Sequence, residues 1–192
     1  MTPEENKQIA ELMRSEKERA RGYADYFGWS INRDLEEMNV VKQLAIGLEK
    51  DNKLFFSNIQ ARGRPNDPPD CEAVIGNNER IAIEVTELVD GNAIRAFKAG
   101  ATYEWAEWDK KKFLSSIEEA ITSKDSRFPM LKGAPYPGGY IVVIYTDEPD
   151  LNQETVKGYL NNHEFCKPLH ATNVYILLSY DPNIKGCPYF EL

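Results

Sequence analysis

The sequence predicts an α/β fold in which a mixed central β-sheet is flanked by helices. Two continuous apolar runs, Tyr140 to Tyr145 and Val174 to Tyr180, have the pattern of strands that are covered on both faces. Two further runs, Cys71 to Ile75 and Ile81 to Leu88, surround the turn sequence GNNER and indicate an antiparallel hairpin. Helical segments between the strands supply the crossovers that parallel pairing requires, so the sheet should contain both kinds of pairing.

The N-terminal segment is the first predicted element. Residues 4–26 are highly charged and carry a thin apolar stripe at helical spacing, and Gly28 interrupts this pattern. We therefore expect residues 1–28 to be a helical extension and residues 29–192 to be a single α/β domain. The extension either packs on the edge of the domain or acts as an arm through which two chains form a homodimer.

A second helix is predicted from Ile31 to Lys50, with Asn32 as its N-cap. A strand at Leu54 to Ile59 follows, and then a loop rich in proline and glycine. The face of the helix that should be buried consists of apolar residues at helical spacing: Leu35, Met38, Val41, Leu44, Ala45 and Leu48.

The segments after the hairpin complete the predicted order. Residues 89–101 are expected to form a mobile connection, and a long helix should run from about Tyr103 to Ser123. A shorter helix near Glu154 to Asn161 should join the last two strands. The chain thus reads as two helices, a strand, a hairpin, a helix, a strand, a helix and a strand, which is an α/β arrangement.

Length, charge and cysteine content narrow the class of protein. No apolar run among the 192 residues approaches 18, so no membrane-spanning helix is expected. The N-terminus has no apolar signal segment, and the three cysteines form no CxxC pair, so we expect a cytoplasmic protein with free thiols. The net charge of −8 argues against a general nucleic-acid coat protein.

The charge is distributed unevenly along the chain. Residues 23–94 contain thirteen acids and seven bases, whereas residues 95–132 contain six acids and eight bases. The acidic excess therefore precedes residue 95, where it would suit a metal site, and the basic segment follows it directly.

The hairpin brings two carboxylates together. If its loop is the three residues Gly76 to Asn78, Asp70 lies directly opposite Glu84 on one face of the sheet, whereas a two-residue loop would shift the register by one. Two carboxylates so close repel each other unless one is protonated or a divalent cation lies between them. Glu84 also interrupts an apolar strand, so this face is either open to water or part of a cation site.

Two helices could contribute further groups. On the helix before the hairpin, Glu37 falls inside the apolar stripe or at its margin, whereas Glu36 falls on the polar side. On the long helix after the hairpin, Lys124 falls near the centre of the stripe that Ile117 and Ala120 define. Lys124 therefore either extends from the helix end into solvent or reaches the two carboxylates.

The run PPDCEAVIGNNERIAIEVTEL resembles the core of the PD-(D/E)xK superfamily, the restriction-endonuclease-like nucleases. Pro69-Asp70 corresponds to the Pro-Asp of that motif. Glu84-Val85-Thr86 corresponds to its acidic-x-Lys tripeptide, with Thr86 in place of the lysine.

The resemblance covers residues 31–146 and extends to the two helices. Some members of the superfamily carry the motif lysine on the following helix, which is where Lys124 lies, and Glu37 corresponds to the glutamate of the preceding helix. The fold that the resemblance implies is the restriction-endonuclease-like one.

The activity that the resemblance implies is that of an endonuclease that hydrolyses phosphodiester bonds of DNA or RNA with Mg²⁺ or Mn²⁺ as cofactor. Asp70 and Glu84 would be the direct metal ligands, and Glu37 would hold a metal-bound water. Lys124 would position the attacking water. The alternative is a catalytically inactive protein of the same fold that binds nucleic acid or another protein, which Thr86 and the negative charge favour.

Contacts with nucleic acid are expected from the basic residues 95–132 and from Arg62 and Arg64 in the loop before Asp70. The basic segment contains three aromatic residues that would stack on bases: Tyr103, Trp105 and Trp108. Alternatively, Trp105 anchors the core and the run DKKK at residues 109–112 is a solvated helix face.

Overall fold

The computed structural model describes residues 4, 7, 26–27, 33–76, 78–100 and 106–192. The predicted N-terminal helix, and with it the expected dimer arm, lies almost entirely outside these residues. Asn32, Tyr103 and Trp105 lie outside them as well.

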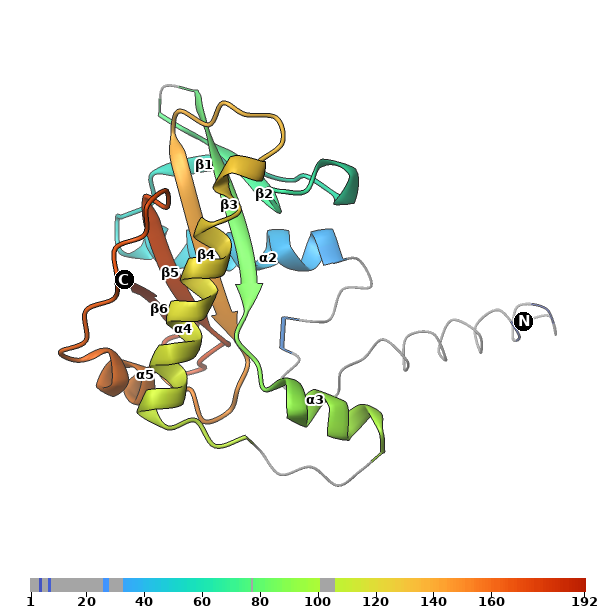
Figure 1. The fold of residues 1–192 in the computed structure, drawn as a ribbon, viewed down its shortest axis with the longest axis vertical. Helices are drawn as coiled ribbons and strands as arrows, with labels where there is room; N and C mark the ends of the chain where they lie inside the picture. The colour runs from blue at the N-terminus through green and yellow to red at the C-terminus, as the bar shows by residue number, and fades with distance from the viewer. Residues whose placement is uncertain (1–3, 5–6, 8–25, 28–32, 77, 101–105) are drawn as a thin grey trace.

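The described residues form a six-stranded mixed sheet with the strand order β1-β2-β3-β4-β5-β6 (Figure 1). Strands β1, β2 and β3 pair antiparallel, β3, β4 and β5 pair parallel, and β6 is antiparallel to β5. This arrangement confirms the predicted α/β class and mixed sheet. The bounds of the strands are β1 Phe56–Ala61, β2 Cys71–Ile75, β3 Glu79–Glu87, β4 Gly139–Thr146, β5 Asn173–Leu178 and β6 Tyr189–Glu191.

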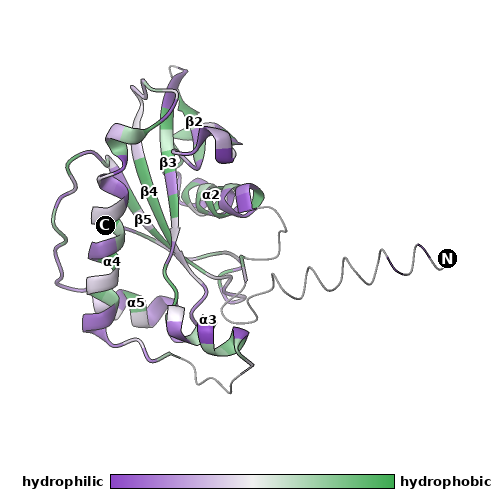
Figure 2. Ribbon diagram, turned by 45° about the vertical axis from the view of Figure 1, so that its right-hand side comes forward, coloured by the Kyte–Doolittle hydropathy of each residue, from purple (hydrophilic) through white to green (hydrophobic). Residues whose placement is uncertain are grey.

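Helices cover both faces of the sheet (Figure 2). Helix α2 (Arg33–Lys50) contributes to one apolar cluster together with the odd-numbered side chains of β3, such as Ile83. Helices α4 (Lys110–Asp125) and α5 (Gln153–Leu160) contribute to a second cluster on the opposite face, together with Ala82. The alternation of side chains along the buried strands thus builds two separate cores. None of the described helices has the length and apolar character needed to cross a membrane.

The buried face of α2 differs from the predicted one. Leu35 is 45% exposed, whereas both Glu36 and Glu37 are buried. The buried positions follow one helical face, which passes through the two glutamates rather than through Leu35. Glu36 is accommodated because the hydroxyl of Tyr145 donates a hydrogen bond to its Oε1 at 2.8 Å. The expectation that Glu36 faces the polar side is therefore wrong.

The connection after the hairpin is also more ordered than predicted. Residues Gly91–Lys98 form the helix α3 rather than a mobile segment. Its N-cap is Asp90, whose side chain accepts hydrogen bonds from the backbone N–H groups of Asn92 and Ala93 at 2.8 and 3.1 Å. The next helix begins at Lys110 because Asp109 caps it. Both capping residues are aspartates that the apolar periodicity does not detect.

The remaining differences are small shifts at the ends of elements. Strand β1 begins at Phe56, two residues later than predicted, and continues to Ala61. Strand β6 was not predicted, because its three residues are too few to establish an alternating pattern. Two short 3₁₀ turns, η1 (Arg64–Asn66) and η2 (Phe128–Met130), lie in the loops that flank the candidate site.

Candidate functional site

The hairpin register places the two predicted carboxylates together. Cys71 lies opposite Ile83 and Ile75 lies opposite Glu79, so the connection has the three residues 76–78 that the predicted register requires. Extended by one step, this register places Asp70 opposite Glu84. Their neighbours Cys71 and Ile83 belong to the core under α2, so the two carboxylates lie on the α4 face of the sheet.

Lys124 lies between these carboxylates. Its side chain is buried, and its Nζ donates to Asp70 Oδ2 at 3.1 Å and also to Glu84 Oε2. The hydroxyl of Tyr140 in β4 donates to the backbone carbonyl of Lys124 at 2.7 Å and so holds the last turn of α4. Of the two orientations that its helical phase allows, the structure therefore has the one toward the carboxylates. The position at the helix C-terminus also favours a cation.

Asp70 is held by the neighbouring strand. Its Oδ2 accepts a hydrogen bond from the backbone N–H of Val85 at 2.7 Å, in addition to the bond from Lys124. The side chain is 3% exposed. A buried carboxylate fixed by both a main-chain donor and an ammonium group has little rotational freedom, so its position is set before any ligand arrives.

Glu84 is the most deeply buried group of the site, with no exposed surface. Burial, and after it the negative charge of Asp70, raise its pKa to about 7, against the opposing effect of Lys124. Its Oε2 is bonded to Lys124, but its Oε1 has no hydrogen-bond donor in the described part of the chain. A buried oxygen without a donor is unusual in a purely structural ion pair.

Arg127 is a member of the site that the sequence did not indicate. Its Nη1 lies 3.1 Å from Glu84 Oε2 and its Nη2 lies 3.0 Å from Asp67 Oδ1. It lies three residues after Lys124, a spacing that would place both on one helical face, but the predicted helix ended at Ser123. The structure extends α4 to Asp125 and turns the chain there, which brings Arg127 back over Glu84.

Glu37 approaches the site from α2, on the other side of the sheet edge. Burial raises its pKa first and the charge of Asp70 raises it further, whereas Arg33 lowers it through a hydrogen bond of 2.6 Å from its Nε to Glu37 Oε1. Arg33 lies one turn before Glu37 and was also not predicted. Its spacing of four residues from a glutamate is the signal that would have identified the pair.

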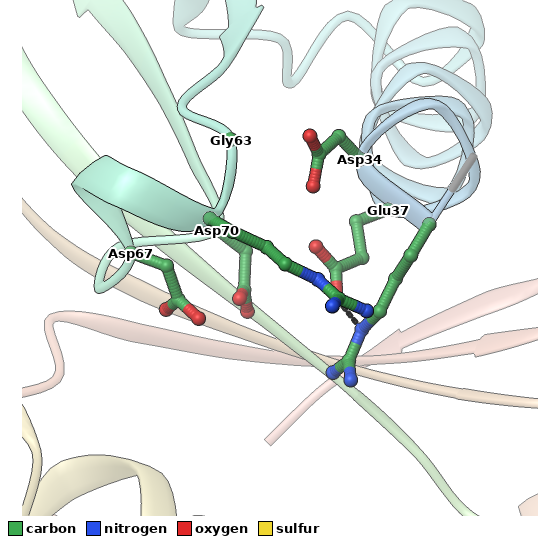
Figure 3. A pocket seen from close by; sticks show the side chains of 7 residues that line it. Asp34, Glu37, Gly63, Asp67 and Asp70 are labelled. Atoms are coloured by element: carbon green, nitrogen blue, oxygen red, sulfur yellow. Dashed lines mark hydrogen bonds and ion pairs between the residues drawn. The ribbon is translucent and has the colours of Figure 1, made fainter.

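A small pocket that is open to solvent lies between α2 and the loop before β2. Figure 3 shows Asp34 and Glu37 extending from α2 and Asp67 and Asp70 extending from the loop before β2, toward the same space. The pocket is lined by two basic side chains, four acidic ones and a glycine: Arg33, Arg64, Asp34, Glu37, Asp67, Asp70 and Gly63. The site therefore opens to solvent through this pocket, which Asp70 and Glu37 both line.

The oxygen atoms of the site suit a small divalent cation. No three acidic, histidine or cysteine side chains within the described ranges gather closely enough to form a metal cluster. Glu37 shares the pocket with Asp70, whereas Glu84 is not among its lining residues. Mg²⁺ needs only one or two carboxylates, because it retains several waters and takes phosphate oxygens as further ligands. Asp70 and Glu84 supply two hard oxygen ligands, and the donor-free Oε1 of Glu84 fits such an ion.

Several residues expected near nucleic acid have other partners. Arg62 Nη1 lies 3.3 Å from Glu72 Oε2, within a cluster that Arg80 completes. Lys112 pairs with Asp90 at 2.8 Å and lies over the ring of Trp108, which is buried. Trp108 is thus part of the core rather than a base-stacking residue, whereas Trp105, for which a core role was expected, lies outside the described residues. Arg64, by contrast, lines the pocket.

Comparisons with family models, curated proteins and solved structures find no match for this chain. The interpretation of the site therefore depends on the mixed sheet with its flanking helices and on the side-chain geometry described above.

Proposed function

We propose that this protein is a divalent-metal-dependent endonuclease that hydrolyses phosphodiester bonds of DNA or RNA. The observation that carries the proposal is the buried ammonium of Lys124 between the carboxylates of Asp70 and Glu84, which come from the two strands of one hairpin. This is the arrangement that the PD-(D/E)xK resemblance implies, with the lysine supplied by a helix.

The energetic cost of this cluster supports a functional origin. Taking a lysine and two carboxylates out of water costs several kcal/mol per ion, and an apolar replacement of similar volume is often as stable or more stable. The surrounding residues on this face, such as Ala82 and Val142, are apolar, so the core offers no structural need for the charges. Groups that are costly and converge beside an open pocket are typical of catalytic sites.

The proposed roles follow the chemistry of each group. Asp70 and Glu84 would hold Mg²⁺ or Mn²⁺, and Glu37 would orient a water molecule at the pocket side. When bound, the ion polarises the phosphoryl oxygen and lowers the pKa of a bound water. Lys124 would orient the attacking water and stabilise the negative charge that develops on the phosphate.

Thr86 need not carry the role of the motif lysine under this proposal. It lies two residues after Glu84 on β3, and a threonine hydroxyl is an uncharged donor that cannot replace an ammonium. The lysine on α4, the helix that covers this face of the sheet, supplies the missing charge and is already hydrogen-bonded to both carboxylates.

A second candidate function is a catalytically inactive binding protein of the same fold. The observation that favours it is that Lys124 and Arg127 both pair with Glu84, so much of the negative charge is compensated by the chain itself. A site of this kind would be stable without a metal and would have no catalytic requirement for one.

Cleavage assays distinguish the two. Wild type should cleave supercoiled plasmid DNA, single-stranded DNA or RNA with Mg²⁺ or Mn²⁺ and not with EDTA. Asp70→Asn and Lys124→Met should each lower the rate at least about 100-fold, because each removes a preorganised charge from the reacting centre. Lys157→Met, at an exposed position on α5, is the matched control and should cleave like wild type.

Far-UV circular dichroism of each variant shows whether it is folded. If Lys124→Met does not fold, Asp70→Asn still tests the proposal. A wild-type protein that cleaves none of the three substrates with either metal would overturn the nuclease proposal and favour the binding protein. Cleavage that persists in both site variants would show that the activity has another origin.

A further inference from the structure

We propose that Arg127 is a phosphate-binding residue of this site, held on Glu84 until a divalent cation displaces it. The inference rests on the proposed function and assigns to the site a residue that the sequence placed only in the basic segment 95–132 and not among the candidate site residues. In this proposal the guanidinium of Arg127 leaves the carboxylate of Glu84 and binds a phosphate of the substrate.

The geometry of Arg127 differs from that of Lys124. The Lys124 side chain is 9% exposed and is enclosed by two carboxylates that are themselves buried. The Arg127 side chain is 29% exposed and spans from the buried Glu84 to Asp67, whose side chain is 42% exposed. Arg127 therefore lies at the boundary between the buried carboxylates and solvent, where a substrate phosphate would arrive.

The charges of the site explain why the guanidinium would change partners. Asp67, Asp70 and Glu84 carry three negative charges, and Lys124 and Arg127 carry two positive ones. Lys124 and Arg127 both pair with Glu84, so a divalent cation on Asp70 and Glu84 would repel both; Arg127, the more exposed of the two, is the one that can turn away toward solvent. The N–H groups that it releases match the oxygens of a phosphate in a two-bond arrangement.

A structural arginine elsewhere in the molecule shows the contrast. Arg80 donates to Glu72 at 2.6 Å and to the carbonyl of Gly133 at 2.7 Å, and its guanidinium lies over the ring of Tyr136. It thereby joins a strand to a loop through three kinds of partner. The described contacts of the Arg127 guanidinium are both with carboxylates at the candidate metal site.

The first measurement is the affinity for Mn²⁺, obtained from thermal melting at increasing Mn²⁺ concentration in wild type, Arg127→Gln and Arg80→Gln. Arg127→Gln should bind Mn²⁺ roughly 30-fold more tightly, the effect of removing a unit positive charge about 4 Å from a divalent ion in a high dielectric. Arg80→Gln should bind Mn²⁺ like wild type. A structural Arg127 predicts the opposite sign, because its loss would disorder Glu84 and weaken the affinity for Mn²⁺.

The second measurement is fluorescence anisotropy of a labelled 20-base-pair DNA duplex with Ca²⁺ or EDTA. Arg127→Gln should bind the duplex at least about tenfold more weakly than wild type with Ca²⁺, and equally with EDTA, where Glu84 retains the arginine. Arg127→Lys keeps the charge without the paired N–H groups and should be intermediate.

The outcomes separate this inference from the proposed function. If wild type shows no Mn²⁺ shift and no Ca²⁺-dependent DNA binding, both are overturned. If wild type shows both and Arg127→Gln matches it in both, the metal site stands and Arg127 is not its phosphate-binding residue. Tighter Mn²⁺ binding combined with weaker DNA binding is the result that supports the inference.

Discussion

At the scale of single residues, the site depends on how Glu84 is charged. It is buried on a strand whose other inward side chains are apolar, next to a second carboxylate, and these surroundings raise its pKa to about 7. The sequence reveals this residue because a glutamate in the middle of an apolar run is rare. It does not reveal Arg127 or Arg33, because their contacts depend on where a helix turns and on a neighbour one turn away.

The raised pKa of Glu84 predicts a pH dependence of stability. Between its ordinary pKa of 4.5 and about 7, the folded protein retains a proton that the unfolded chain has lost, so the free energy of unfolding falls as the pH rises. Relative to Glu84→Gln, the free energy of unfolding of wild type should fall by roughly 3 kcal/mol across this window. Above it, the curves of the two proteins against pH should run parallel.

The measurement is urea unfolding in EDTA at pH values from 4.5 to 8. Glu119→Gln, which removes an exposed carboxylate from the same region of α4, is the control and should follow wild type throughout. Parallel curves for wild type and Glu84→Gln across the whole range would contradict the effect of burial on Glu84.

At the scale of elements, the hairpin and the end of α4 position the chemistry. The register of the hairpin could be predicted because side chains alternate along a strand and the loop length leaves two choices. The phase of α2 could be predicted only in part: Glu37 falls in the apolar stripe and is buried, but Glu36 is buried as well and Leu35 is exposed. Helix α3 was missed because eight residues with an aspartate cap give too short a periodic signal.

The position of α4 relative to the sheet depends on a hydrogen bond between Tyr140 and the carbonyl of Lys124. Tyr140→Phe removes this donor and leaves the carbonyl with the backbone N–H of Arg127, at 3.0 Å, so it should lower the free energy of unfolding by about 1 kcal/mol. Tyr180→Phe, at a tyrosine that is 45% exposed, should change it by less than about 0.5 kcal/mol. Urea unfolding of both variants checks this, and equal losses would show that the hydroxyl of Tyr140 does not anchor the helix.

At the scale of the whole molecule, an acidic chain with a net charge of −8 surrounds a site proposed to bind a polyanion. Most of the architecture could be predicted, because continuous apolar runs mark the central strands and helical segments separate them. The convergence of Glu84, Lys124 and Arg127 could be predicted only in part, because it depends on how segments that are far apart in the sequence meet in the fold. A divalent cation would also reduce the repulsion between such a protein and phosphate groups.

The most direct test of the metal site is thermal melting of wild type and Glu84→Gln, each with EDTA and with Mn²⁺. Mn²⁺ at a hundredfold excess over its Kd should stabilise wild type by about 2.7 kcal/mol, or roughly 5–10 °C in Tm for a chain of this size. Glu84→Gln should remain folded in EDTA and show no rise in Tm with Mn²⁺. Equal Mn²⁺-induced shifts in the two proteins, or no shift in wild type, would contradict a metal site at Asp70 and Glu84.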